Sequence, residues 1–159
     1  MQSAYKGALL DRRTGVMLLS VLSRTQLFVI LTMGCFATAL GETAAPSNAS
    51  VYIISPKDGD TVASPFRVQF GLSGMGVAPA GVNKPNTGHH HLLIDANEPL
   101  DPNEPIPQDK THLHFGAGQT EALVELPPGK HTLQLVLGDW SHLPFHPSIA
   151  SDVITITVK

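Results

Sequence analysis

Residues 122–137 read ALVELPPGKHTLQLVL, and this stretch decides the fold class because it holds a strand pattern on each side of one turn. Apolar residues recur at every second position before the turn and again after it, at Leu133, Leu135 and Leu137. A period of two is typical of a strand with one buried face. In the turn, residues 127–130 (PPGK), Pro fixes φ and Gly permits a positive φ. The stretch therefore predicts two strands joined by a tight turn.

The same period recurs along the chain after residue 50, with turn signals between the strands and no convincing helical period. Residues 73–88 and 96–110 have no period and predict two long loops, a kind of loop that often carries function. We therefore predict an all-β fold, an immunoglobulin-like β-sandwich of about seven to eight short antiparallel strands, with a small barrel as the alternative. The other expected strands are residues 51–54, 66–72, 89–95, 112–115 and 154–158.

The first 41 residues have the features of a secretory signal peptide. Residues 27–40 are apolar and follow Arg24, but a membrane-spanning helix needs about 20 apolar residues, so the run is short for a span. Small residues end the run, and we expect cleavage after Ala39 or Gly41. The sequence thus predicts a periplasmic or secreted protein that meets the membrane only through its signal peptide.

The N-terminal region leaves some alternatives open. Met17 is an alternative start, because the stretch before it is long for the basic region of a signal peptide. The residues before Cys35 fit a lipidation signal poorly, so we do not expect a lipoprotein. Residues 42–50 are small and polar and predict a linker, which leaves residues 51–159 as a single domain without cysteine.

Charge and motif content exclude several functions. From residue 42 onward the chain carries twelve Asp and Glu against six Lys and Arg, a net charge of −6. Such an acidic domain has no electrostatic reason to bind nucleic acid. The sequence contains no G-x-S-x-G, no H-E-x-x-H and no phosphate-binding loop before a helix. We favour a protein that is not an enzyme and leave open only a metal-dependent enzyme with an open coordination position.

All eight histidines follow residue 50, and five of them lie on two predicted strands. Residues two apart on a strand share a face. If the large apolar residues of these strands face the core, His89 and His91 project together from the opposite face, and so do His112 and His114. If the two strands are also neighbours, a spacing of about 4.8 Å places the four imidazoles in one small patch.

Such a patch predicts a metal site. Imidazole is a ligand that Cu(II) and Zn(II) both accept, and we favour copper over zinc. The predicted ligands are His89, His91, His112 and His114. Four further residues are peripheral candidates. Met75 would be a soft ligand and His142 part of a lid, while Asp95 and Glu121 would be hard ligands or partners that fix a histidine tautomer.

The alternative is a non-enzymatic binding or scaffold module of the cell envelope. In that case the histidines are structural, hydrogen-bonded to turn carbonyls and to each other, and hold the two long loops for an unknown envelope partner. His131, at the exit of the 127–130 turn, is interpreted as structural.

Four segments carry a resemblance to a known family. They read ISPKDGDTVASPFRVQFGLSGMGVAPAG (54–81), GHHHLLID (88–95), HLHFGAGQTEA (112–122) and LPPGKHTLQLVLGDWSH (126–142). Together they resemble bacterial domain-of-unknown-function family 4399, over residues 51–159. The resemblance implies an exported, β-sandwich-like domain and brings no established activity or site residue. One departure is Trp140, where the family pattern leads us to expect another polar residue near His142.

Overall fold

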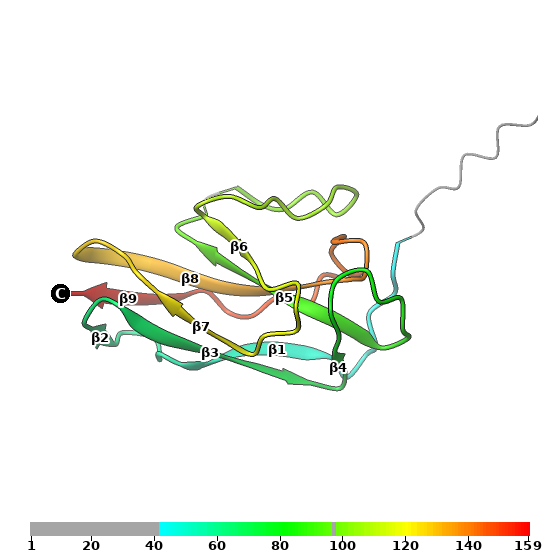
Figure 1. Ribbon diagram of the computed structural model, residues 1–159, viewed down its shortest axis with the longest axis horizontal. Helices are drawn as coiled ribbons and strands as arrows, with labels where there is room; N and C mark the ends of the chain where they lie inside the picture. The colour runs from blue at the N-terminus through cyan, green and yellow to red at the C-terminus, as the bar shows by residue number, and fades with distance from the viewer. Residues whose placement is uncertain (1–41, 97) are drawn as a thin grey trace, which may run out of the picture. The chain divides into compact units, whose positions relative to one another are not determined.

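The computed structural model describes residues 42–96 and 98–159 (Figure 1). The predicted signal peptide, with Met17, Cys35 and both expected cleavage positions, lies outside these residues. Within the described ranges, no helix has the length and apolar character that crossing a membrane requires.

Two β-sheets make up the described domain, which confirms the all-β sandwich and excludes the closed barrel. One sheet has three strands in the order β1-β3-β7, and the other has six, in the order β2-β9-β8-β5-β4 with β6 also paired to β5. The strands are β1 (Ser50–Ser55), β2 (Thr61–Val62), β3 (Phe66–Ser73), β4 (Gly76–Val77), β5 (Thr87–Ile94), β6 (His112–His114), β7 (Glu121–Val124), β8 (Gly129–Gly138) and β9 (Ile154–Val158).

The strand count and the strand directions differ slightly from the prediction. The strands β2 and β4 have two residues each, too few to show an alternating pattern in the sequence. Both pair in parallel, β2 with β9 and β4 with β5, so the sandwich is not entirely antiparallel. The pair β4–β5 also places a strand inside the predicted 73–88 loop.

The main core lies between the two sheets and follows the predicted alternation. Val68 and Phe70 of β3 face Leu92 of β5 and Leu135 of β8, and all four are at most 4% exposed. Burial of each such side chain contributes about 1.5–3 kcal/mol. Because β5 pairs with β8 along one edge and with β4 and β6 along the other, it is an interior strand of the larger sheet.

A second, smaller core covers the outer face of the larger sheet. Leu93 of β5 and Val136 of β8 point away from the main core and pack against Ile106 of the 96–110 connection. Ala96 and Leu100 of the same connection complete this cluster. We call residues 96–110 the strap. The strap covers the face of β5 that the main core leaves open.

The predicted linker is, from residue 43, part of the domain. Ala45 N donates to His146 O at 2.9 Å, and His146 N donates to Thr43 O at 2.8 Å. The hydroxyl of Thr43 donates to the carboxylate of Asp139 at 2.6 Å, and β1 already begins at Ser50. Small polar residues have no alternating pattern, yet their backbone groups can pair as any others do, which is why the sequence signal is misleading here.

The packing of the strap gives a first prediction. Ile106 is 5% exposed, so Ile106→Ala should lower the free energy of unfolding by about 2–4 kcal/mol, measured by urea denaturation. Leu123→Ala is the control, because Leu123 is 67% exposed and its truncation should change stability by less than about 0.5 kcal/mol. Equal losses in the two variants would show that Ile106 does not anchor the strap.

Candidate metal centre

The two histidine-bearing strands are neighbours. Strand β6 pairs antiparallel with β5, with His114 opposite His91 and His112 opposite Leu93. Leu92 lies in the main core, so His89 and His91 lie on the other face of the sheet, beneath the loops that cover it. The sequence left this adjacency open, and the register now brings the two His-x-His segments side by side.

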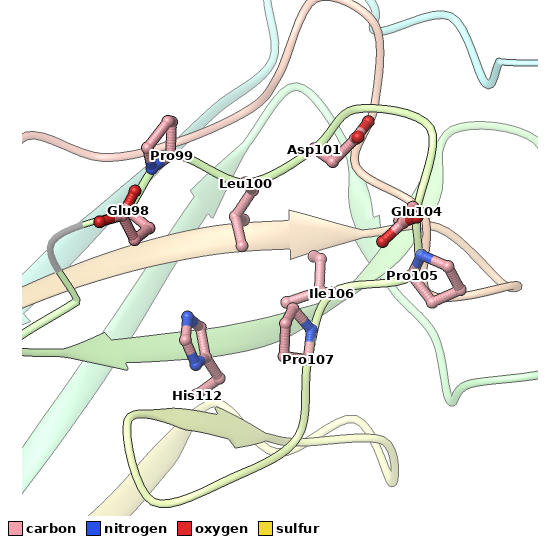
Figure 2. Close-up of a pocket in the computed structure, with 9 residues that line it drawn as sticks. All are labelled: Glu98, Pro99, Leu100, Asp101, Glu104, Pro105, Ile106, Pro107 and His112. Carbon is pink, nitrogen blue, oxygen red and sulfur yellow. The ribbon is translucent and has the colours of Figure 1, made fainter.

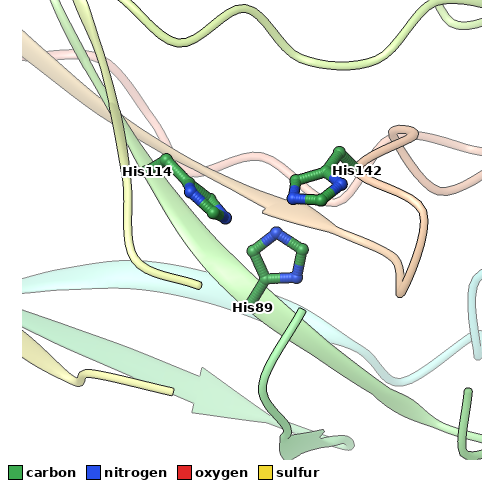
Figure 3. Close-up of side chains that lie close together, drawn as sticks. All are labelled: His89, His114 and His142. Carbon is green, nitrogen blue, oxygen red and sulfur yellow. The ribbon is translucent and has the colours of Figure 1, made fainter. Parts of the chain in front are cut away.

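Four imidazoles gather on this face, and we call His89, His91, His114 and His142 the histidine cluster. The ring centroid of His89 lies 4.9 Å from that of His91 and 5.0 Å from those of His114 and His142. The rings of His114 and His142 are 4.9 Å apart. One potential ligand nitrogen from each of His89, His114 and His142 lies within 4.8 Å of the other two, and Figure 3 shows these three rings turned toward one another.

The cluster is enclosed, and two glycines make room for its rings. His89 and His91 are fully buried, while His114 and His142 are partly buried. A Cβ at Gly138, which pairs with His89, would lie 2.9 Å from Nε2 of His91. A Cβ at Gly116 would lie 2.5 Å from Nε2 of His114. Any larger residue at these positions would displace an imidazole.

Burial keeps the imidazoles of His89, His91 and His114 neutral. Desolvation, followed by the charges of His142 and His114, lowers the pKa of His89 to about 4. Desolvation, followed by the charges of His89 and His114, lowers the pKa of His91 to about 3. The pKa of His114 is lowered as well, by burial and then by His142. These three rings are therefore uncharged at neutral pH, and neutral imidazole is the form that binds a metal ion.

Several ring nitrogens of the cluster are buried without a hydrogen-bond partner in the described part of the chain. They are Nδ1 of His89, Nδ1 of His91 and Nε2 of His114. Nε2 of His91 and Nε2 of His89 are 3.0 Å apart, so these two rings contact each other through the nitrogens that remain. Buried polar atoms nearly always have a partner, and three exceptions at one place distinguish the cluster from an ordinary hydrogen-bonded network.

The structure does not place His112 in the cluster. Its Nδ1 lies 3.0 Å from the carboxylate of Asp109 and 3.0 Å from the hydroxyl of Thr111. Its ring instead lines a pocket of about 260 Å³ under the strap, together with Leu100, Ile106 and other strap residues (Figure 2). The cause is the register, which sets His112 opposite Leu93 rather than opposite a histidine.

Three of the peripheral candidates also lie elsewhere. Asp95 accepts from Nδ1 of His131 at 2.7 Å, and Nε2 of His131 lies 2.9 Å from the carbonyl oxygen of Pro127, so both ring nitrogens of His131 are engaged in a structural role. Glu121 lies on β7 of the smaller sheet and pairs with Arg67. Met75 packs against the main core.

The fourth peripheral candidate, His142, is a full member of the cluster. It follows β8 in a tight turn with φ of 72°, and this turn brings its ring over β5. Strand periodicity gives no information about a residue in such a turn, so the sequence spacing could not identify His142 as a member of the same cluster as His89. Sequence reasoning also missed Gly116, Gly138 and Asp139, since a single Gly or Asp at a strand end gives no specific signal.

The lowered histidine pKa values give a prediction for the metal-free protein. In the unfolded chain these histidines titrate near 6.5, whereas in the fold His89 titrates near 4 and His91 near 3. Between pH 6.5 and 4 the unfolded state therefore binds more protons, so stability falls as pH falls through this window. We expect urea denaturation to show a loss of about 4 kcal/mol between pH 7 and pH 5, about 2 kcal/mol from each of His89 and His91.

The variant His91→Gln should lose about half of this pH sensitivity, because it removes one depressed group. His146→Gln is the control, because the side chain of His146 is 62% exposed. Asp95 and Asp109 also have lowered pKa values, but their contribution to the free energy of unfolding is lost below pH 4, outside the range from pH 7 to 5. A stability that is flat from pH 7 to 5 would contradict the burial of neutral imidazoles.

Comparison with solved structures yields a similar chain among the fibronectin(III)-like modules of Clostridium thermocellum CbhA. The identity is 12%, the TM-score is 0.35, and the match covers 70% of this chain and 45% of that chain, so this chain spans less than half of its length. No curated protein matches the sequence. The family model described as Domain of unknown function (DUF4399) matches residues 68–159, more than half of the chain, and this range includes the whole histidine cluster. The resemblance seen in the sequence motifs is confirmed, and the chain belongs to the DUF4399 family.

Proposed function

We propose that this protein binds one transition-metal ion in the histidine cluster, with copper favoured over zinc, and serves as an exported carrier or buffer of that ion. The observation that carries the proposal is the convergence of His89, His114 and His142, whose ligand nitrogens lie within 4.8 Å of one another. These residues come from β5, β6 and a turn after β8, so the fold and not local sequence brings them together.

The chemistry of the ligands favours a borderline metal ion. Imidazole suits Cu, Zn, Ni and Fe, whereas Mg²⁺ and Ca²⁺ require oxygen ligands. Two imidazole nitrogens bound to one tetrahedral ion at about 2.0 Å lie about 3.3 Å apart. The ligand nitrogens would therefore move together by about an ångström on binding, which His142 can provide because it lies in a turn.

The composition of the cluster supports transport or storage rather than catalysis. The ring of His91 lies 4.9 Å from that of His89 and 5.0 Å from that of His114, so in this proposal it occupies the coordination position that the three converging histidines leave open. Catalytic sites keep such a position open. Residues 27–40 of the sequence support export, and a periplasmic or secreted carrier needs no thiolate ligand.

The alternative is a binding or scaffold role in which the histidines are structural, and His112 and His131 fit that role. Both ring nitrogens of His131 have partners, and Nδ1 of His112 has two. The histidine cluster differs from them because it holds buried nitrogens that lack any partner in residues 42–96 and 98–159. A purely structural network would leave these atoms uncompensated at a cost of about 1–3 kcal/mol each.

Metal titration tests the proposal directly. After chelator stripping, isothermal titration of Cu(II) and then Zn(II) should show one equivalent bound with Kd below about 1 μM. His89→Gln, His114→Gln and His142→Gln should each weaken binding by at least tenfold, because each removes one ligand. His112→Gln and His146→Gln are the controls, and each should change Kd by less than about threefold.

Weak binding at several sites, or binding that is unchanged in His89→Gln, would overturn the proposal. The histidines would then be structural, and an envelope partner of the strap and of residues 78–86, the loop between β4 and β5, would become the leading explanation.

A glycine substitution tests the geometry independently of the ligands. Gly138→Ala would place a methyl group 2.9 Å from Nε2 of His91 and 3.5 Å from Nε2 of His89, so it should weaken metal binding by about tenfold. Gly76→Ala is the matched control, because its methyl group would meet Thr87 Cγ2 at 3.5 Å and Asn86 O at 4.0 Å, both ordinary contacts. Equal affinities in the two variants would show that the ion is not held beside Gly138.

A further inference from the structure

The turn that carries His142 is built around one buried carboxylate. Asp139 is 1% exposed and follows the last residue of β8. Its Oδ1 accepts from Ser141 N at 2.8 Å, from Ser141 Oγ at 2.8 Å and from Leu143 N at 3.0 Å. Its backbone oxygen also accepts from His142 N at 3.0 Å. Asp139 therefore fixes the residues on both sides of His142.

The backbone of His142 needs this support. Its φ of 72° lies in the left-handed region, which residues other than glycine rarely adopt because of the strain around Cβ. The carbonyl oxygen of His142 accepts from Ile106 N at 2.9 Å, so the strap holds the same residue from the other side. With the backbone held in this way, the ring lies 4.9 Å from that of His114 and 5.0 Å from that of His89.

The second oxygen of Asp139 is held by a distant part of the chain. Thr43 Oγ1 donates to Oδ2 of Asp139 at 2.6 Å across 96 residues of sequence, and within the described ranges Oδ2 has no other partner. Backbone hydrogen bonds between Thr43, Ala45 and His146 hold this N-terminal segment in place. The segment 43–45 thus completes the hydrogen bonding of the carboxylate that shapes the metal-site turn.

The members of the cluster differ in how freely they can leave it. His89 and His91 belong to the interior strand β5, and His114 belongs to β6, so withdrawal of any of them would break sheet hydrogen bonds. His142 is partly exposed and lies in a turn. It is therefore the ligand whose departure disturbs the least structure.

From these contacts we infer that Thr43 and Asp139 form a latch that holds His142 in the metal site and thereby slows release of the ion. The inference rests on the proposed function and extends it from the affinity for the metal ion to the rate at which the ion is released. Thr43 and Asp139 are positioning residues, since they act on the ion only through His142. A segment whose sequence resembles a linker thus controls how long the ion stays bound.

The test is the rate of metal release from the full chain loaded with Zn(II), measured by stopped flow with an excess of a chromophoric chelator. Thr43→Val removes the hydroxyl and keeps the side-chain shape, so release should be about five- to tenfold faster than in the wild type. Thr155→Val is the matched control, because the exposed hydroxyl of Thr155 makes no side-chain hydrogen bond among the described residues, and its rate should be unchanged.

A double-variant cycle separates the latch from a general loss of stability. In a His142→Gln background, Thr43→Val should have no further effect on the release rate, whereas in a His112→Gln background its full effect should remain. If Thr43→Val accelerates release equally in both backgrounds, it loosens the whole domain, and the latch is overturned.

A measurement without metal distinguishes failure of the latch from failure of the proposed function. In NMR spectra of the metal-free protein, Thr43→Val should shift or broaden the ring resonance of His142 and leave that of His131 in place. Metal binding with unchanged His142 resonances and release rates would overturn the latch alone. Absence of metal binding in the wild type would overturn the proposed function, and with it any role of the latch in exchange.

Discussion

Strand β5 must bury both of its faces, and most of the structure follows from that constraint. One face carries Leu92 and Ile94 into the main core, and the other carries His89, His91 and Leu93. A strand in the middle of a sheet cannot expose a large apolar side chain such as Leu93 without losing about 1.5–3 kcal/mol. The strap covers Leu93 with Ile106, and in doing so it also encloses the outer face beside the histidines.

That enclosure gives the imidazoles the properties that the proposed metal ligands need. Burial removes water from His89 and His91 and lowers their pKa values well below neutrality, so protons do not compete with a metal ion at pH 7. Burial also leaves ring nitrogens without partners in the described residues, a state that costs about 1–3 kcal/mol for each atom. An ion that coordinates these nitrogens, as proposed, would offset the cost and would couple metal binding to folding stability.

The sequence predicted the parts of this arrangement that depend on strand periodicity. The sandwich, the main core and the shared face of His89 and His91 all follow from a period of two. The pairing of β5 with β6 sets His114 opposite His91 and His112 opposite Leu93, and no local pattern reports which register two strands adopt. The inclusion of His142 depends on a turn with a positive φ, and the docking of residues 43–45 depends on backbone hydrogen bonds to His146. Both are tertiary features that leave no periodic signal in the sequence.

The cluster is distributed over two strands and one turn, and under the proposed function this distribution affects how the ion is exchanged. Ligands on β5 and β6 are fixed by sheet hydrogen bonds, which keeps them close to the geometry that a metal ion needs and reduces the reorganisation on binding. A ligand in a turn has fewer constraints, so it can close on the ion and withdraw again. A site with only strand ligands would exchange its ion slowly, and a site with only loop ligands would bind weakly. The combination of buried strand histidines with one turn histidine suits a protein that must hold an ion in transit and still give it up, which is why we favour a carrier or buffer over a permanent structural site.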